Sequence, residues 1–338
     1  MKSLRLMACS AMLLPSVALA QQQIPTGSLP PDIAAAIKAA PLTQTLIPIS
    51  GEEKFAQQII KADEISFAAG AKLTLTGLNY PYIVVAAQRI KFANPDTYSI
   101  IQRDPQAVAA VGSDGPAGPN GADNPGETNR TGNPGYPGGP GGPAVAGQTR
   151  QLPDVYLVAG ELSDPKGPIP AGLLNLVLLF RGIDGGDGGT GGKGGNGGRA
   201  GNGKEGATSL FDCKEGGGPG GTGGAAGPGG RGGDAGAGGQ GADLVFVTTR
   251  PAYEVLSYSR INNVGGRAGL PGRGGGPGNP GPGGQGAPAN GWCKGTGGGS
   301  PGNFPSPANL GFGNTSADGA KGTVTAVILP SVGPLFGK

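Results

Sequence analysis

The residues best able to form a covalent bond are two cysteines in the same kind of sequence context. Cys213 and Cys293 each interrupt a glycine-rich run, and they follow Arg181 and Arg260 at almost the same number of residues. If the two runs lie side by side, equal path lengths bring both thiols to the same height. Exported proteins in oxidising compartments keep such pairs as disulfides. The spacing therefore predicts an intramolecular Cys213–Cys293 bond.

Catalytic and metal-binding chemistry finds little support. The chain has no histidine, and this removes the commonest general base and transition-metal ligand. The run from Gly198 to Lys204 is similar to a phosphate loop, but Glu205 stands where Ser or Thr must bind Mg²⁺. Asp184 and Asp187 are spaced as in calcium repeats but lack the apolar position of that motif. We expect no metal, no cofactor and no enzymatic activity.

Apolar and basic residues flank the two cysteines. Aromatic side chains are common anchors in interfaces, so these residues form a candidate contact patch. The alternative is a small apolar plug that seals the end of the glycine-rich bundle around the disulfide. The candidate residues are Leu210, Phe211, Lys214, Trp292 and Lys294.

Three arginines recur at similar places. Arg103, Arg181 and Arg260 each end an apolar stretch and are almost equally spaced along the chain. They could form an anion site, but a structural ladder is favoured, in which each guanidinium donates to backbone carbonyls where a strand becomes a glycine-rich segment.

Glycine follows a period of three in the segments that carry these residues. From 182 to 206 the triplet is Gly-Gly-polar, and a second run from 218 to 239 keeps glycine at one phase throughout. This is the period of an extended left-handed helix without internal hydrogen bonds. A composition with 73 Gly and 33 Pro is also typical of disorder, but the maintained register favours order. The glycines expected to pack against neighbouring backbone are Gly185, Gly188, Gly191, Gly194, Gly197, Gly221, Gly224, Gly227, Gly230 and Gly233.

Three modules share one plan. In each, an apolar strand ends in arginine, a glycine-rich excursion follows, and a second strand closes the module at 155–159, 244–247 or 324–329. Each excursion is broken near its middle, so it should run out as one extended helix and return as another. A run of about 25 residues would reach roughly 75 Å.

The segment 51–111 is low in glycine and repeats with an offset of 25 residues. The repeat aligns Ile60 with Val85, Phe67 with Phe92, Leu73 with Tyr98, and Leu75 with Ile100. Stacked coils of a β-solenoid explain this pattern, and a small antiparallel sheet is the alternative. The expected fold is thus mostly β and extended, with almost no α-helix: a β-solenoid-like scaffold with a bundle of polyglycine-II helices at 112–322, and a final strand and tail at 323–338.

The N-terminus has the features of a bacterial secretion signal at 1–20, namely Lys2 and Arg5, an apolar stretch, and a small-residue cleavage site before Gln21. Cys9 would leave with it. Residues 21–50 are expected to be a linker or docking arm, with a short helix possible after Pro31. The mature chain would be almost neutral, so no overall attraction to nucleic acid or anionic membranes is expected. No apolar run long enough to span a membrane remains.

The runs from Gly182 to Gly206 and from Gly218 to Gly239 resemble the polyglycine-II bundles of phage tail-fibre adhesins and of springtail glycine-rich antifreeze proteins. In both families extended three-fold helices pack in a lattice through backbone hydrogen bonds. The resemblance covers 112–322 and rests on the period. In the adhesins, loops at the distal end bind a receptor, so the resemblance implies that the breaks of the excursions are contact loops. The charged polar phase here departs from the regular ice face of the antifreeze proteins.

Together these patterns predict an exported, non-enzymatic structural or adhesive protein, at the cell surface, in a matrix or in the periplasm. Its expected partner is a surface glycan or a matrix polymer, or another copy of itself. The alternatives are an ice-binding protein and a polysaccharide-acting enzyme on a β-solenoid.

Overall fold

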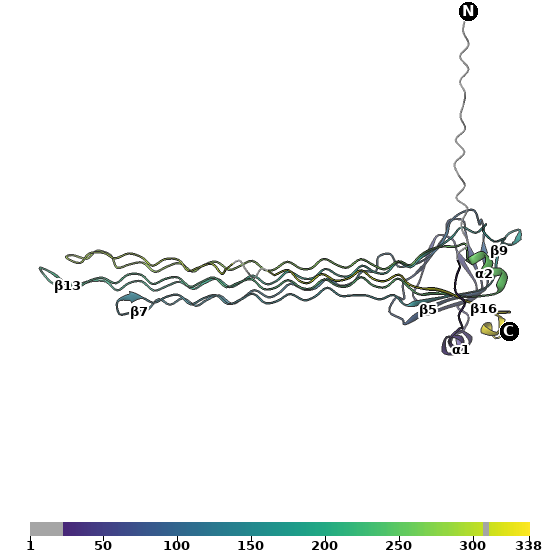
Figure 1. Cartoon of the computed structure of the whole chain (residues 1–338), viewed down its shortest axis with the longest axis horizontal. Coiled ribbons are helices and arrows are strands. Elements are labelled where there is room, and N and C mark those ends of the chain that lie inside the picture. Colours follow the sequence, from purple (N-terminus) through teal and green to yellow (C-terminus); the bar gives the residue numbers. More distant parts are fainter. Residues whose placement is uncertain (1–22, 307–310) are drawn as a thin grey trace, which may run out of the picture.

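The computed structural model describes residues 23–306 and 311–338, so the predicted signal peptide lies outside the described residues. The described chain forms a β-rich head and a long, narrow rod that projects from one side of it (Figure 1). Most strands of the head contain short apolar stretches, and the rod is built from the glycine-rich excursions.

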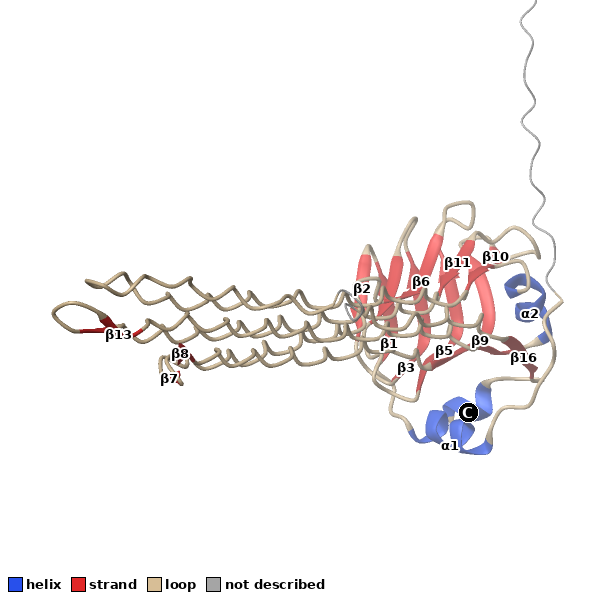
Figure 2. Cartoon of the chain, turned by 60° about the vertical axis from the view of Figure 1, so that its left-hand side comes forward, coloured by secondary structure: helices blue, strands red, loops and turns tan. Residues whose placement is uncertain are grey.

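Two sheets form the head, and the chain passes between them in turn (Figure 2). The larger sheet contains, in order, β1 (Gln44–Ile49), β3 (Ile59–Phe67), β5 (Tyr82–Phe92), β9 (Asp154–Asp164), β14 (Leu244–Thr248) and β16 (Val324–Ile328), with the short β10 (Gly167–Pro168) antiparallel to β9. The smaller sheet contains β15 (Arg260–Asn262), β11 (Leu176–Leu179), β6 (Ser99–Arg103), β4 (Lys72–Leu75) and β2 (Glu52–Phe55).

Apart from β10, neighbouring strands of both sheets are parallel. Like side chains therefore stack on one another along the head. Ile65 pairs with Ile90, and the rings of Phe67 and Phe92 stack with centroids 5.3 Å apart. All four side chains are buried. Full burial of one such side chain is worth about 1.5–3 kcal/mol, so the core between the two sheets holds the head together.

The 25-residue repeat is correct for one sheet and wrong for the other. β3 pairs with β5 in the expected register, with Ile60 opposite Val85 and Phe67 opposite Phe92. Because the strands are parallel, the antiparallel alternative is wrong. In the smaller sheet Leu73 lies opposite Ile101 and Leu75 opposite Arg103, not Tyr98 and Ile100. The connection from β5 to β6 is longer than that from β3 to β4, and this shifts the register.

The coils of the head continue beyond 111. Each excursion leaves after a strand of the smaller sheet (β6, β11 or β15) and returns into the larger sheet as β9, β14 or β16. The three returning strands pair in register, with Val155 opposite Leu244 and Leu244 opposite Val324. The rod therefore consists of insertions at the same turn of successive coils.

The residues expected to be a linker or docking arm belong to the head. α1 (Pro31–Ala39) buries Ile33 and Ile37 in a second apolar cluster with Val84 and Val158 of the larger sheet. β1 pairs with β3, and the backbone N–H of Gly27 donates to the carbonyl of Ala326 in β16 (2.7 Å). This N-terminal segment thus covers one edge and part of the outer face of the larger sheet.

A second helix, α2 (Arg250–Leu256), includes the first two residues of the apolar stretch 255–260, which was expected to be a strand ending in Arg260, and strand β15 begins only at Arg260. Pro251 in its first turn suits a helix start, and Ala252, Val255 and Leu256 are buried. A short apolar run does not distinguish helix from strand. The 3₁₀ helix η2 (Gly333–Phe336) ends the chain beside α1.

Lys61 is a buried charge that fixes α1 to the sheet. Its Nζ donates to the carbonyls of Ile37 (2.7 Å), Ala40 (3.0 Å) and Lys38 (3.3 Å) at the C-terminal end of the helix. Burial lowers the pKa of Lys61. A cation near a helix C-terminus also interacts favourably with its dipole.

We therefore expect Lys61→Ala to reduce the stability of the head by about 1–3 kcal/mol, because buried carbonyls lose their donor. Faster amide exchange across 31–40 would accompany it. Lys54→Ala, at an exposed position of β2, is the matched control and should change neither quantity. Equal effects of the two substitutions would contradict the anchoring role of Lys61.

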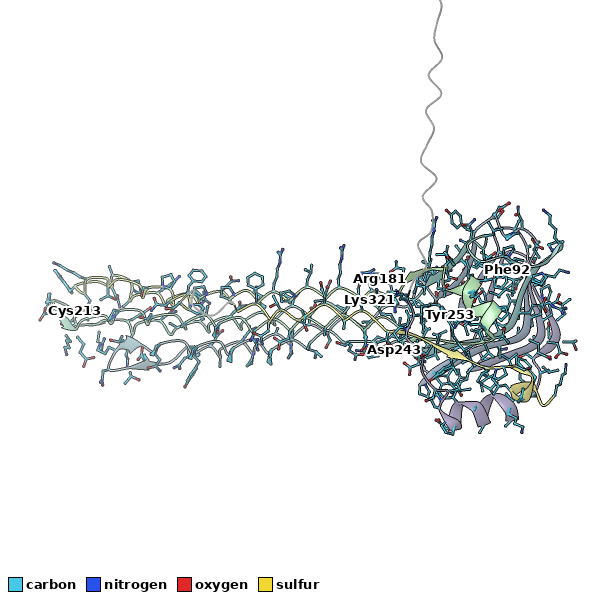
Figure 3. All side chains as sticks on the ribbon, turned by 45° about the vertical axis from the view of Figure 1, so that its right-hand side comes forward. Phe92, Arg181, Cys213, Asp243, Tyr253 and Lys321 are labelled. Atoms are coloured by element: carbon cyan, nitrogen blue, oxygen red, sulfur yellow. A yellow bond between two sulfur atoms is a disulfide. The ribbon has the colours of Figure 1, made fainter. Side chains whose placement is uncertain are left out.

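Extended segments of the three excursions, which we call legs, run side by side along the described part of the rod (Figures 1 and 3). Backbone hydrogen bonds join neighbouring legs at every third residue, as in Gly185 to Arg267 (2.8 Å) and Gly198 to Tyr136 (2.8 Å). The pattern of partners arranges the legs in two layers of three. The outgoing legs are 110–124, 182–206 and 263–287, and the return legs are 132–148, 217–242 and, in the described residues, 296–306 and 311–322.

The position of a leg explains how much glycine it carries. The central legs, 182–206 and 217–242, each hydrogen-bond to four other legs, whereas the outer legs have fewer neighbours. A Cβ at Gly194 would meet Gly227 O of one neighbour, and a Cβ at Gly195 would meet Pro119 O of another. Two crowded sides require two glycine phases, and this is why the Gly-Gly-polar triplet occurs in the central excursion alone.

The predicted packing glycines all lie at crowded positions. At each, an added Cβ would come closer than 3.0 Å to backbone atoms of a neighbouring leg, a distance that real Cβ atoms essentially never show. This holds for Gly185, Gly188, Gly191, Gly194, Gly197, Gly221, Gly224, Gly227, Gly230 and Gly233.

Candidate functional site

The far end of the rod brings together the two breaks that contain cysteine (Figure 3). The second excursion turns between β12 (Ala207–Thr208) and β13 (Cys213–Glu215), and the third turns at a bridge between Asn290 and Cys293. Cys213 and Cys293 form a disulfide with a Cα–Cα distance of 4.8 Å. The bond predicted from path length is therefore present, and it fixes the two turns side by side.

Three large apolar side chains project from this tip. Leu210 is 86% exposed, Phe211 is 84% exposed and Trp292 is 61% exposed. An apolar plug would require these side chains to be buried, so that interpretation is wrong. Lys214 and Lys294 are also exposed beside them. We call Leu210, Phe211, Trp292, Lys214 and Lys294 the tip patch.

The polar groups of the tip bond mainly to one another. The indole N–H of Trp292 donates to the carbonyl of Leu210 (3.2 Å) and so joins the two turns. Within the first turn, Ser209 N donates to Asp212 O (2.8 Å), and Asp212 Oδ1 accepts from Cys213 N (2.7 Å). In the second, the backbones of Asn290 and Cys293 bond to each other in both directions. The tip is a small, internally bonded unit.

The first excursion ends short of the tip and is clamped there by Arg130 (Figure 1). Its turn lies between β7 (Glu127–Thr128) and β8 (Thr131–Gly132). The Arg130 guanidinium donates to Gly216 O (2.8 Å) and Glu205 O (2.6 Å) and pairs with the Glu215 carboxylate. Arg130 therefore joins the first and second excursions, as the disulfide joins the second and third. The sequence marked this turn as a break but gave no sign of the clamp.

Asp and Asn side chains of the polar phase bond to neighbouring legs. Asp184 Oδ1 accepts from Arg267 N (2.7 Å), and Asn196 Oδ1 accepts from Asn279 N (2.9 Å). These N–H groups face the outer side of the rod. A carbonyl acceptor there would require a further leg, and the Asp or Asn side chain takes its place. The Asx ladder, as we call this set, was missed by sequence reasoning, which left the polar phase to solvent. Its members are Asp114, Asn120, Asp123, Asp184, Asp187, Asn196, Asn202 and Asp234.

Asp234 gives the ladder a pH dependence. Donation from the backbone N–H of Asn314, with a smaller effect of nearby Arg231, holds the pKa of Asp234 below its usual value. A carboxyl with a lowered folded-state pKa stabilises the fold above its unfolded pKa near 3.9 and loses this contribution as pH falls through the lowered value. We expect amide exchange at Asn314 to accelerate, relative to the intrinsic rate, below about pH 4.

Asp234→Asn is the matched variant, because it keeps an acceptor oxygen and removes the titration. Its protection at Asn314 should be independent of pH across this range, whereas Asp234→Ala should lose protection at every pH. If acid leaves the protection of the Asn314 amide in the wild type unchanged, the role of the Asp234 carboxylate is contradicted.

The three arginines do not occupy equivalent places. Arg103 Nε donates to Arg181 O (2.6 Å), and its Nη1 donates to Asp104 O (2.6 Å), where strand becomes rod. Arg181 instead pairs with Asp184 at 2.6 Å. Arg260 begins β15, lies opposite Val177 and stacks on Tyr98. Arg103 thus donates to backbone carbonyls as expected. Arg181 and Arg260 make different contacts, so the three arginines do not form a ladder.

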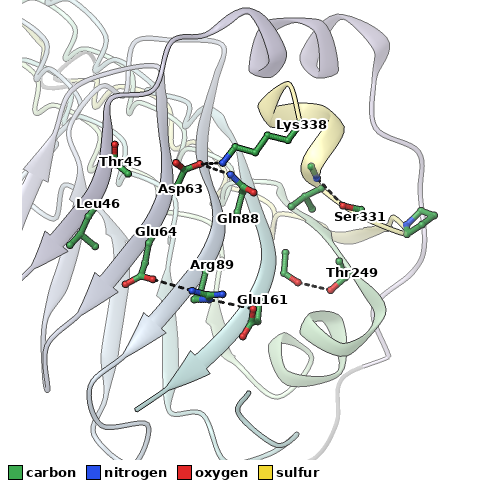
Figure 4. A pocket seen from close by; sticks show the side chains of 14 residues that line it. Thr45, Leu46, Asp63, Glu64, Gln88, Arg89, Glu161, Thr249, Ser331 and Lys338 are labelled. Carbon is green, nitrogen blue, oxygen red and sulfur yellow. Dashed lines mark hydrogen bonds and ion pairs between the residues drawn. The ribbon is translucent and has the colours of Figure 1, made fainter. Parts of the chain in front are cut away.

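A second polar site lies on the outer face of the larger sheet (Figure 4). This cleft of about 650 Å³ contains Asp63, Glu64, Arg89, Glu161 and Lys338. Arg89 pairs with Glu64 (3.5 Å) and Glu161 (3.3 Å), and Lys338 pairs with Asp63 (2.9 Å). Lys338 and Gln88 hold the pKa of Asp63 below its usual value. These ion pairs connect β3, β5 and β9 with one another and with the C-terminal residue Lys338.

Neither a cluster of metal-binding side chains nor a membrane-spanning helix occurs in the described residues. In the described ranges no group of three or more His, Cys, Asp or Glu side chains is placed to hold a metal ion. Nor does any helix in the described part of the chain have the length and apolar character needed to cross a bilayer. No protein-family model matches the chain, and comparisons with curated proteins and with solved structures find no match.

Proposed function

We propose that this is an exported, non-enzymatic surface or matrix protein whose glycine-rich legs form a polyglycine-II lattice, and that the lattice serves as a rigid spacer for a contact site. The observation that carries the proposal is the tip patch, with Leu210 and Phe211 more than four-fifths exposed at the end of the rod farthest from the head. Large apolar side chains exposed together are uncommon on soluble proteins and mark interaction sites.

The rod supports this role because its order does not depend on a large apolar core. Hydrogen bonds between legs recur along its length, and the disulfide and the Arg130 clamp join the three excursions near the tip. A pre-organised site loses less conformational entropy on binding than a flexible loop. A disulfide also suits an exported protein.

Binding of the purified protein to whole cells and to a glycan array tests the proposal. The double variant Phe211→Ser/Trp292→Ser should lose binding. Phe312→Ser removes a similarly exposed aromatic residue (62%) from the side of the rod and should keep it. Binding that survives loss of both tip residues would overturn the adhesive role of the tip.

An ice-binding function is the second candidate, because one face of the rod exposes small residues at regular spacing. The outward phase of the return leg 217–242 exposes Thr222, Ala225 and Pro228 at three-residue spacing. Arg231 and Asp234 interrupt this face with an ion pair (2.9 Å). Thermal hysteresis of the purified protein would favour this function over adhesion.

A further inference from the structure

The tip patch is a convex projection, not a groove. Leu210 and Phe211 lie at the turn between β12 and β13, and Trp292 lies at the adjacent turn. With exposures of 86%, 84% and 61%, these side chains are largely in contact with solvent. A projection of this kind can enter a soft apolar medium without needing a preformed pocket.

The main-chain polar groups of the tip are suited to such a medium. Backbone groups that enter lipid must find partners within the protein. Here the two turns bond internally through Ser209 with Asp212 and Asn290 with Cys293, and the indole N–H of Trp292 already donates to Leu210 O. The apolar side chains can therefore lose water without leaving these donors unpaired.

Two lysines lie directly behind the apolar residues. Lys214 and Lys294 each follow a disulfide cysteine, so the disulfide holds both at one level. Neither forms an ion pair within the described residues, whereas the nearby Arg130 and Lys204 pair with Glu215 and Glu127. Lysine side chains bury their methylene stems beside apolar surface and keep the ammonium at the level of lipid phosphates.

We propose that the tip patch docks on a phospholipid surface, with Leu210, Phe211 and Trp292 in the boundary between headgroups and acyl chains, and Lys214 and Lys294 at the phosphates. This inference rests on the proposed role of the tip as a contact site and names its partner. Interfacial segments bury about 5–10 Å into this boundary, a depth that side chains of a single turn can reach. The two acids beside these lysines already have partners: the carboxylate of Asp212 accepts from Cys213 N, and Glu215 pairs with Arg130.

Trp292 provides the test, because it is the only tryptophan in the chain. Vesicles of phosphatidylcholine mixed with phosphatidylglycerol are added to the oxidised, full-length protein. We expect the Trp292 emission to shift to shorter wavelength and to be quenched by lipids brominated in the upper acyl chain. Pure phosphatidylcholine should bind more weakly, because the lysines then lack anionic headgroups.

Variants then assign the binding to the tip. Leu210→Ser and Phe211→Ser should each weaken vesicle cosedimentation by about tenfold or more, since each removes apolar burial worth at least 1.4 kcal/mol. Lys214→Gln/Lys294→Gln should remove the preference for phosphatidylglycerol. Phe312→Ser on the side of the rod is the control and should bind as the wild type does.

The outcomes separate this inference from the proposed function. An unchanged Trp292 spectrum and no cosedimentation would overturn the lipid partner, as would binding that Leu210→Ser and Phe211→Ser leave intact. If the protein does not bind vesicles but still binds cells or glycans through Phe211 and Trp292, the adhesive role stands and the partner of the tip is not lipid. If nothing binds through the tip, both proposals fall.

Discussion

Replacement of Gly194 by valine is expected to destabilise the rod by about 3 kcal/mol or more, at the upper end of overpacking effects. A Cβ at this position would overlap the carbonyl of Gly227 and crowd Pro228 O. The two legs cannot separate easily, because Gly194 N donates to Gly276 O (2.9 Å) and Gly227 N donates to Gly195 O (2.8 Å). Amide exchange by mass spectrometry should show loss of protection on both central legs.

Two controls, one on a neighbouring leg and one on the same leg, make this result specific. Gly276→Val replaces another rod glycine, but a Cβ there would meet no atom within 4 Å. Lys193→Val changes the exposed residue next to Gly194. Both should stay within about 0.5 kcal/mol of the wild type. If Gly276→Val is as harmful as Gly194→Val, the loss comes from backbone conformation and not from packing between legs.

The spacing of glycine identified positions that lie against a neighbouring backbone. A period of three fixes which positions of a leg face the same side, and at each predicted packing glycine an added Cβ would meet the backbone of a neighbouring leg. The difference between the central and outer legs could also be interpreted only with neighbours in place. The sequence shows that Gly182 to Gly206 carries two glycine phases, but not that this leg lies between four others.

The head was predicted less completely, because apolar stretches of a few residues are ambiguous. Alternation and repeat spacing were enough to place Ile60 and Phe67 opposite Val85 and Phe92. They could not reveal that the longer connection after β5 shifts the register of Leu73. Val255 and Leu256 suit a strand as well as a helix. The helix is favoured by the packing of α2 against β9 and β14, which the sequence alone does not show.

At the candidate site the covalent bond was predictable and the hydrogen bonds were not. Cys213 and Cys293 could be paired because path length along parallel legs is a property of the sequence. The clamp by Arg130 depends on which leg lies beside its turn, so no local pattern reports it. The Asx ladder did leave a signal, since Asp184, Asp187 and Asn196 recur in the outward phase, where a short acceptor side chain can reach the next backbone.

Loss of the disulfide is expected to free the tip while leaving the rod intact. The bond joins residues separated by 80 positions, and constraint of a loop this long is worth about 4 kcal/mol by chain entropy. In Cys213→Ser/Cys293→Ser the turns at 207–215 and 290–296 should therefore exchange their amides faster. Residues 188–198 should remain protected, because their hydrogen bonds to neighbouring legs do not involve the tip.

Non-reducing peptide mass spectrometry provides the direct check on the wild type. A single linked peptide pair containing Cys213 and Cys293 is expected, and reduction should reproduce the exchange pattern of the double serine variant. Two free thiols, or dimers linked through either cysteine, would contradict the side-by-side arrangement of the second and third excursions. Loss of protection along the whole rod would instead show that the tip, and not the contacts between legs, maintains the register of the glycines.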